Sequence, residues 1–514
     1  MNSFSDEPIP ARLPEPSEPR GRLGAAVSWL LIAAAVAYMA AGRRLQDRVE
    51  KRIAERSTTR PVGEPALPSF QLRLAGRYAV GAHNLFDRGG RTAPAPATSP
   101  TTVPATKPTT RPSTAPATAP ATGPATGPAT SPASTQSTSA ARMETSLLDS
   151  VNKAAKSPED RLRAAIVAGE IAGPEAALSQ LDETFDSPAT RDDAEALRAL
   201  YRGDDGPLEP ARREGLVRRH EWFGELAVAY GKPAGDSQRR EVIRPARRTV
   251  LAALCAAGAA GLGLLTGVVL LIVALVDRLG GRLRFAYQRA QREESTVPFL
   301  EAFAAYLAGM VVVSTAVGLI AGRSRGASWF VIAVIPCAFF WPLLRGVRGG
   351  VLRRGLGWTA PRGVFREIGA GIVGYLAGLP LLAAGAVVSF FLQRLSGADT
   401  THPLMNEIGH GGAWRAAQLF LIAAVWAPVV EETMFRGAFY HHLRRRLPWP
   451  VAAAFVALVF AAIHPQGWAA IPTLGAIGFS FAAMREWRGS IVAPMVAHAL
   501  NNGMVTLLLL MMVG

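Results

Sequence analysis

Residues 416–437 read AAQLFLIAAVWAPVVEETMFRG, and this stretch decides which class of fold the chain adopts. A long apolar run passes without a turn signal into two carboxylates and an arginine. Charged side chains inside a membrane span are costly, and they usually belong to a functional site. We therefore expect a transmembrane helix that carries Glu431 and Glu432 into a buried site.

The side chains of this helix point in different directions. At 100° per residue, Glu432 and Arg436 lie on one face as an i, i+4 pair. Glu431 points about 100° away from that face. We expect Arg436 to neutralise Glu432, which leaves Glu431 facing the interior of the bundle as a candidate general base.

Two further polar motifs follow in apolar surroundings. Phe460 and His464 share one helix face at i, i+4, and so do His498 and Asn502. Histidine can act as a base, an electrophile or a metal ligand, and asparagine donates hydrogen bonds without titrating. Both motifs therefore add candidate catalytic side chains to the carboxylate pair.

The depth of these residues in the membrane follows from counting along the chain. Glu431 lies about as far before the arginine-rich turn near 446–448 as His464 lies after it. In an antiparallel helical hairpin, this spacing puts the two side chains at the same level. His498 follows the next turn on the same membrane side and can reach a similar depth. We expect two carboxylates, two imidazoles and an amide to converge in one water-accessible cavity.

The apolar character extends over most of the second half of the chain. Only 18% of the 514 residues are charged, whereas a soluble globular chain carries about 25%. Most of the charge-free runs suffice for a span of about 20 residues, and 447–484 suffices for two, because Pro465 breaks it. We predict an all-α, polytopic membrane helix bundle with about eight core spans and one N-terminal span. The runs without Asp, Glu, Lys or Arg are 249–276, 302–322, 326–344, 368–393, 447–484 and 489–514.

The first half of the chain predicts a different organisation. Residues 91–142 are nearly all Pro, Ala, Thr and Ser, so they cannot bury enough apolar surface to fold, and we predict a disordered linker. Apolar residues at helical spacing predict a small helical extramembrane domain over 143–248. The other expected parts are a polar tail (1–22), an N-terminal transmembrane anchor (23–42), an extramembrane segment (43–90) and a polytopic membrane domain (249–514).

The net charge of +16 comes mainly from arginines placed beside the apolar runs. This placement is typical of residues that set membrane topology and face anionic lipid, as we expect for the loop arginines in general. These include Arg278, Arg345, Arg444, Arg485 and Arg488. Membrane lipid is therefore an expected partner, and nucleic acid is not. The two cysteines, Cys255 and Cys337, have neither zinc-ligand nor disulfide spacing. Nothing in the sequence indicates an oligomeric state.

Taken in order, the three motifs resemble those of the CAAX-processing and bacteriocin-processing (CPBP) intramembrane proteases, also called type II CAAX prenyl endopeptidases. That family carries Glu-Glu-x-x-x-Arg, Phe-x-x-x-His and His-x-x-x-Asn on successive core helices. The resemblance is strongest over about 415–510. It implies an intramembrane endopeptidase that cuts a protein or peptide near its C-terminus or close to the membrane. The matching residues are Glu431, Glu432, Arg436, Phe460, His464, His498 and Asn502.

The resemblance also implies a role for each motif. Glu431 and His464 would activate a water molecule. The oxyanion would be stabilised by His498 and Asn502, and the site would be supported by Glu432 and Arg436.

The use of a metal is left open by the resemblance, because the family has been described both as metal-dependent and as metal-free. If a metal is present, we expect Zn²⁺ held by Glu431, His464 and His498. We favour the interpretation without a cofactor.

Other functions fit the sequence less well. A non-catalytic membrane scaffold or partner-binding protein has no need for three costly buried motifs. A transporter would line a continuous path, and a serine protease built on Ser480 and His498 rests on a serine that is common in membrane helices. The Ala- and Arg-rich composition indicates a bacterial source, so we expect a multi-pass protein of the inner membrane.

Overall fold

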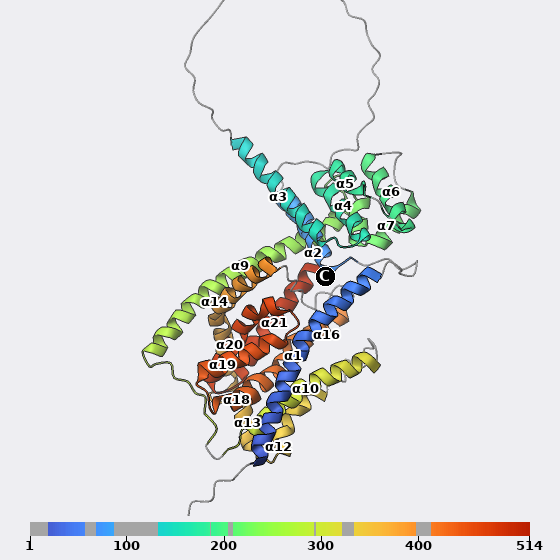
Figure 1. The fold of residues 1–514 in the computed structure, drawn as a ribbon. Helices are drawn as coiled ribbons and strands as arrows, with labels where there is room; N and C mark the ends of the chain where they lie inside the picture. The colour runs from blue at the N-terminus through green and yellow to red at the C-terminus, as the bar shows by residue number, and fades with distance from the viewer. Residues whose placement is uncertain are drawn as a thin grey trace, which may run out of the picture. The chain divides into compact units, whose positions relative to one another are not determined.

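The structure is a computed structural model that describes residues 19–56, 68–86, 132–183, 185, 187–203, 209–291, 294–320, 334–396 and 413–513. Within these ranges every regular element is a helix, so the all-α prediction is confirmed. The chain separates into two compact units (Figure 1). The polar tail, apart from its last residues, and the linker up to residue 131 lie outside the described residues.

The first unit, which we name the helical domain, is built from short helices that start at capping signals. Five of them have proline in the first turn, where the missing N–H is not needed. The side chains of Ser157 and Ser187 accept hydrogen bonds from the backbone of the next turn. The helices are α2 (Phe70–Phe86), α3 (Pro132–Ala154), α4 (Pro158–Ala172), α5 (Pro174–Leu181), α6 (Pro188–Arg202), α7 (Pro210–His220) and α8 (Trp222–Val228).

The boundaries of the helical domain differ from those expected. α2, which lies in the segment expected to be separate (43–90), packs with α3 and α4 and buries Leu72 and Val80 in the same apolar core. α3 begins at Pro132, inside the segment assigned to the linker. Short-range composition does not show either feature, because both depend on packing against helices that lie further along the chain.

A buried polar cluster connects α6 to α7. The Asp193 carboxylate accepts hydrogen bonds from Arg219 Nε at 2.7 Å and from His220 Nε2 at 3.1 Å. Burial lowers the pKa of His220, although Asp193 opposes the shift. Burial alone would raise the pKa of Asp193, but the hydrogen bonds from His220 and Arg219 lower it overall. His220 is therefore neutral and Asp193 ionised at neutral pH.

The second unit, which we name the membrane domain, holds the apolar helices. Five described helices are long and apolar enough to cross a bilayer: Arg22–Ala40, Ser237–Leu279, Val364–Ser396, Trp414–Arg444 and Val492–Met512. Val297–Val312 and Trp449–Ile463 are apolar but shorter. α20 (Ile471–Arg488) ends in charged residues. The predicted span 326–344 is described only from residue 334, as η1 (Ile335–Phe340) and α12 (Trp341–Leu344).

The N-terminal helix α1 (Pro19–Arg56) is part of the membrane domain and not only a tether. It packs against α10 (Val297–Ile320) and α19 (Trp449–Ile463) (Figure 1). The Trp29 ring lies 5.7 Å from that of Phe439 and 5.9 Å from that of Phe455. The predicted anchor therefore contributes apolar contacts to the bundle that holds the candidate site.

A stripe of glycines lets α14 (Val364–Ser396) approach its neighbours closely. A Cβ atom at Gly371 would lie 2.6 Å from the carbonyl oxygen of Ala493 in α21 (Val492–Val513). At Gly385 it would lie 2.6 Å from the carbonyl oxygen of Pro472 in α20. Small residues are the usual means of close helix contact in membranes, where no hydrophobic force drives helices together.

Candidate active site

The helical segment 413–444 carries the carboxylates and is interrupted twice by π-helical turns. It consists of α16 (Ala413–Leu421), η2 (Ile422–Trp426), α17 (Ala427–Glu432), η3 (Thr433–Phe439) and α18 (Tyr440–Arg444). Both η2 and η3 are π-helical. Such turns insert an extra residue into a helix and occur frequently at functional sites. Here they flank the short α17 segment that ends in Glu431 and Glu432.

Glu432 is fully buried and joins two helices. Its Oε1 accepts a hydrogen bond from Arg436 Nη1 at 2.9 Å and another from His498 Nδ1 at 2.8 Å. The structure thus contains the i, i+4 pair expected from the sequence and adds a cross-helix bond to His498. Arg436 is equally buried; its Nη2 donates to the Gly478 carbonyl at 3.0 Å, and its guanidinium lies 4.6 Å from the Phe460 ring centroid.

Glu431 faces both histidines, as the depth comparison predicts. Its Oε2 lies 3.8 Å from His464 Nε2 and 3.9 Å from His498 Nε2. These separations are too long for direct hydrogen bonds, so Glu431 Oε2 is not bonded to either Nε2 atom. The side chains of Glu431 and His464 are 21% and 19% exposed, so small molecules can reach the Glu431 side of the site.

The orientation of both imidazole rings is set by their Nδ1 atoms. His464 Nδ1 lies 2.6 Å from the Phe460 carbonyl oxygen, and His498 Nδ1 faces the Glu432 carboxylate. Because both partners can only accept, both Nδ1 atoms carry a proton, and Nε2 is the atom turned toward Glu431. α19 ends at Ile463, and His464 continues in extended backbone. The turn continues through Gly467, whose φ of 84° favours glycine.

Asn502 also lies near the π-helical segment. Its Nδ2 donates to the Ala423 carbonyl of η2 at 3.0 Å, and its Oδ1 accepts from Asn501 Nδ2 at 3.1 Å. One of the two N–H bonds on Nδ2 is thus committed to the protein. Nδ2 makes no second hydrogen bond within the described residues.

The donor set Glu431, His464 and His498 can be tested as a zinc site. Tetrahedral Zn²⁺ ligands at about 2.0–2.1 Å from the metal lie about 3.4 Å from one another, which is shorter than the 3.8 Å and 3.9 Å found here. Across the part of the chain that the structure describes, no three His, Cys, Asp or Glu side chains form a group that could hold a metal ion. As placed, these residues do not fit a metal.

Residues 413–504 match the Rce1-like family of type II CAAX prenyl endopeptidases. The match runs from the start of α16 into α21, so it contains all six candidate catalytic residues, and it confirms the family resemblance of the motifs. The C-terminal part of the chain is thus similar to this family. The match, together with the apolar helices, indicates an integral membrane protein. No curated protein and no solved structure matches the chain.

Three of the arginines expected to face lipid headgroups are instead buried in the membrane domain. Arg444 pairs with Glu486 at 2.6 Å, and Arg488 pairs with Glu367 at 2.8 Å. Arg485 is 1% exposed, and its Nε donates to the Arg436 carbonyl at 3.2 Å. The expectation was wrong for these three residues, because carboxylates on neighbouring helices and backbone carbonyls offer partners that the linear sequence does not show.

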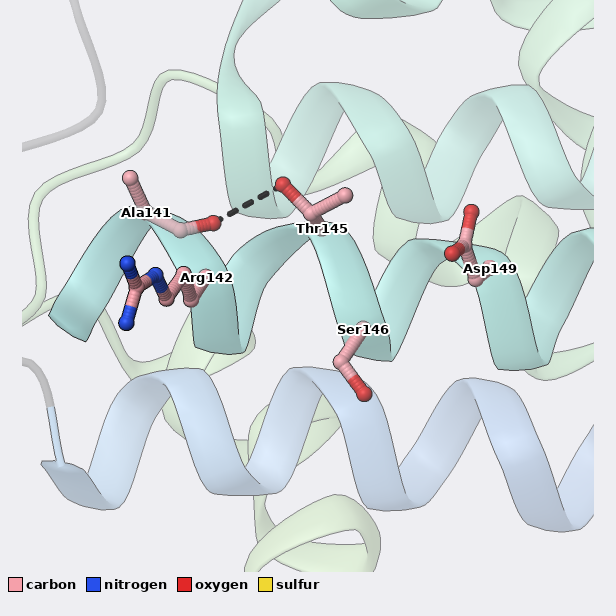
Figure 2. A pocket seen from close by; sticks show the side chains of 5 residues that line it. All are labelled: Ala141, Arg142, Thr145, Ser146 and Asp149. Carbon is pink, nitrogen blue, oxygen red and sulfur yellow. Dashed lines mark hydrogen bonds between the residues drawn. The ribbon is translucent and has the colours of Figure 1, made fainter. Parts of the chain in front are cut away.

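Two other features of the described residues do not add to the site. Ser480 Oγ donates to the Ala476 carbonyl of its own helix at 2.9 Å, so no serine–histidine pair forms. A surface hollow lies along one face of α3, and Figure 2 shows its lining side chains. All five belong to that helix, and none is a histidine or a cysteine: Ala141, Arg142, Thr145, Ser146 and Asp149.

One polar residue beside the site was not singled out from the sequence. Tyr306 lies in α10, is 3% exposed, and interacts electrostatically with Glu431. The available signal was a lone tyrosine in an apolar helix, because a buried hydroxyl usually needs a hydrogen-bond partner. That signal does not identify which other helix supplies the partner.

Proposed function

We propose that this protein is an intramembrane endopeptidase that hydrolyses a peptide bond with a water molecule activated by Glu431 and His464. One observation carries the proposal: Glu431 Oε2 faces the Nε2 atoms of both His464 and His498. The endopeptidase family match over the same segment supports it. Glu432 and Arg436 form the buried support that holds His498 in this orientation.

The proposed reaction uses the carboxylate as a proton carrier. Water donates one hydrogen bond to Glu431 and the other to the Nε2 lone pair of His464. As the water oxygen bonds to the scissile carbonyl carbon, its proton passes to Glu431 and the carbonyl oxygen becomes an oxyanion. When the C–N bond breaks, Glu431 gives that proton to the leaving amine nitrogen. Each atom and charge is accounted for without a metal ion.

The oxyanion needs hydrogen-bond donors aimed at the developing charge. We assign this role to His498 and Asn502, as the family resemblance implies. His498 can donate through Nε2 only when its ring is protonated, because Nδ1 already donates to Glu432. Asn502 contributes the N–H that Ala423 does not use.

The substrate class follows from the setting of the site. We propose a protein or peptide that is cut near its C-terminus or close to the membrane, since Glu431 lies on a helix that can span a bilayer. The Ala- and Arg-rich composition supports a bacterial inner membrane as the location. A prenylated substrate would be unexpected there.

The test is a proteome-wide comparison of protein termini in host cells that carry either wild type or Glu431→Gln, at matched membrane levels. Asp277→Asn serves as a control, because it makes the same acid-to-amide change at a residue outside the site. We expect specific termini to vanish in Glu431→Gln and to persist in the control. If no terminus changes while Glu431→Gln still fails to complement a deletion, the endopeptidase proposal is wrong and a scaffold role takes its place.

A further inference from the structure

We infer that Tyr306 is a further catalytic residue, whose hydroxyl donates a hydrogen bond to the carbonyl oxygen of the substrate as it becomes an oxyanion. This inference rests on the proposed endopeptidase function. It assigns a role to α10, which lies outside the segment that matches the family.

The position of Tyr306 follows from how α10 packs against η3. The Phe303 ring stacks on Phe439 at 4.2 Å and lies 5.0 Å from Phe435, whereas the Tyr306 ring lies 6.4 Å from Phe435. Along α10 the residue numbers rise from 303 to 306, while the numbers of the contacting residues in η3 fall from 439 to 435. The two segments are therefore antiparallel. Glu431 stands one turn before Phe435 on the same helix face, so Tyr306 packs against this segment one turn from Glu431.

The Tyr306 hydroxyl has no partner in the described part of the chain. The side chain is 97% buried, being 3% exposed, and its hydroxyl makes no hydrogen bond there, although it interacts electrostatically with Glu431. Glu431 Oε2 is a buried atom without a hydrogen-bond partner in the described part of the chain. A buried polar group that stays unpaired is costly. Glu431 Oε2 therefore lacks a hydrogen-bonding polar partner among the described residues, and the Tyr306 hydroxyl is a second polar group in its electrostatic range that can bond a substrate atom held there.

The Tyr306 hydroxyl can also donate a hydrogen bond under conditions in which the other candidate donors cannot. The Nε2 atoms of His464 and His498 donate only when their rings are protonated, because both Nδ1 protons are already engaged. Asn502 has one N–H committed to Ala423. A phenol is neutral and keeps its proton at neutral pH. Tyr306 can therefore donate to an oxyanion whatever the protonation state of the histidines.

The aromatic surroundings hold the Tyr306 ring in place. Phe303 lies 6.2 Å from it within α10, and Phe435 packs edge-on from η3. Phe435 in turn contacts Phe460 at 5.2 Å, and Phe460 lies against the His464 ring at 4.2 Å. A donor fixed by packing needs little reorganisation during the reaction, which is the property that makes oxyanion donors effective.

The test is Tyr306→Phe, which removes one oxygen atom and leaves the ring. Purified full-length protein is assayed with an internally quenched peptide that spans the strongest Glu431-dependent cleavage site. Removal of one oxyanion donor lowers kcat about 10²- to 10³-fold, so we expect a fall of that order with little change in KM. Affinity for a phosphinic analogue of the same peptide should fall in parallel. Tyr375→Phe in α14 is the matched control and should behave as wild type.

Two results would overturn the inference. A Tyr306→Phe enzyme with kcat within about twofold of wild type shows that the hydroxyl does not contact the transition state. A raised KM with unchanged kcat shows a role in substrate binding alone. If the proposed endopeptidase function itself is wrong, the result is different, because wild type and Glu431→Gln then produce identical protein termini. The inference about Tyr306 is wrong in that case as well.

Discussion

The buried pair Glu432–Arg436 allows a prediction with a definite magnitude. Glu432→Gln leaves the Arg436 cation fully buried without its ion-pair partner, beside the Gly478 carbonyl and aromatic rings. Removing one partner of a buried ion pair costs about 3–5 kcal/mol. We expect about 3 kcal/mol, the lower end of that range, because Glu431 also interacts with Arg436 and partly replaces the lost anion. Arg436→Met should cost a similar amount, because Glu432 keeps only His498 as a partner.

The double variant Glu432→Gln/Arg436→Met separates pairing from general packing damage. Replacing both members of a buried ion pair is often close to neutral, so we expect a total loss of about 2 kcal/mol or less and a coupling of about 4 kcal/mol. The assay is equilibrium unfolding in mixed detergent and dodecyl sulfate micelles, followed by tryptophan fluorescence. If the two single losses simply add in the double variant, the two residues do not act as a pair and the reasoning fails.

Further predictions concern packing, pH, the nucleophile and the cofactor. Gly478→Ala should lower the free energy of unfolding by about 1–3 kcal/mol, because the new Cβ would lie 3.0 Å from Ala457 Cα and 3.4 Å from Arg436 Nη2. Gly475→Ala is the control, because its new Cβ would meet no atom within 4 Å, and it should be neutral in the same unfolding assay. Acidification below about pH 6.5 should destabilise α6 and α7 by at most about 1.4 kcal/mol per pH unit. The reason is that the pKa of buried His220 is lowered, so only the unfolded chain takes up a proton. The stabilising contribution of Asp193 is lost at still lower pH, as its own lowered pKa is reached. Hydrogen exchange of these helices in the full chain, corrected for intrinsic rates, measures this effect, and a flat profile would contradict it. Ser480→Ala should leave peptide cleavage unchanged, since Ser480 bonds only within its helix, and a large loss would revive the serine-protease alternative. Dialysis against a chelator should likewise leave the cleavage rate unchanged, and loss that zinc restores would show that the ligands move closer around a metal.

Part of the candidate site follows directly from the sequence. The Glu432–Arg436 pair depends only on helical geometry within one segment. The level shared by Glu431 and His464 depends only on equal distances from one turn. Both are local or nearly local relations, which periodicity and counting can capture.

The rest of the site depends on tertiary packing. The bond from His498 to Glu432 and the approach of Tyr306 to Glu431 join helices far apart in the sequence. Arg444 and Arg485 look like loop residues in a linear pattern, yet their partners on other helices allow them to be buried. The π-helical turns could not be predicted from the sequence either, because their segments, IAAVW and TMFRGAF, carry no helix-breaking signal.

Because of these π-helical turns, the number of residues in the segment 413–444 determines how its parts are oriented relative to the candidate site. Each places an extra residue in the helix, so one deletion within Ile422–Trp426 would restore regular winding and rotate all that precedes it by about 100° relative to Glu431. Apolar surface on α16 would then point elsewhere, although no catalytic side chain had changed. In distant homologues, a one-residue gap here would be a more telling sign of lost activity than many substitutions on the lipid-facing surface.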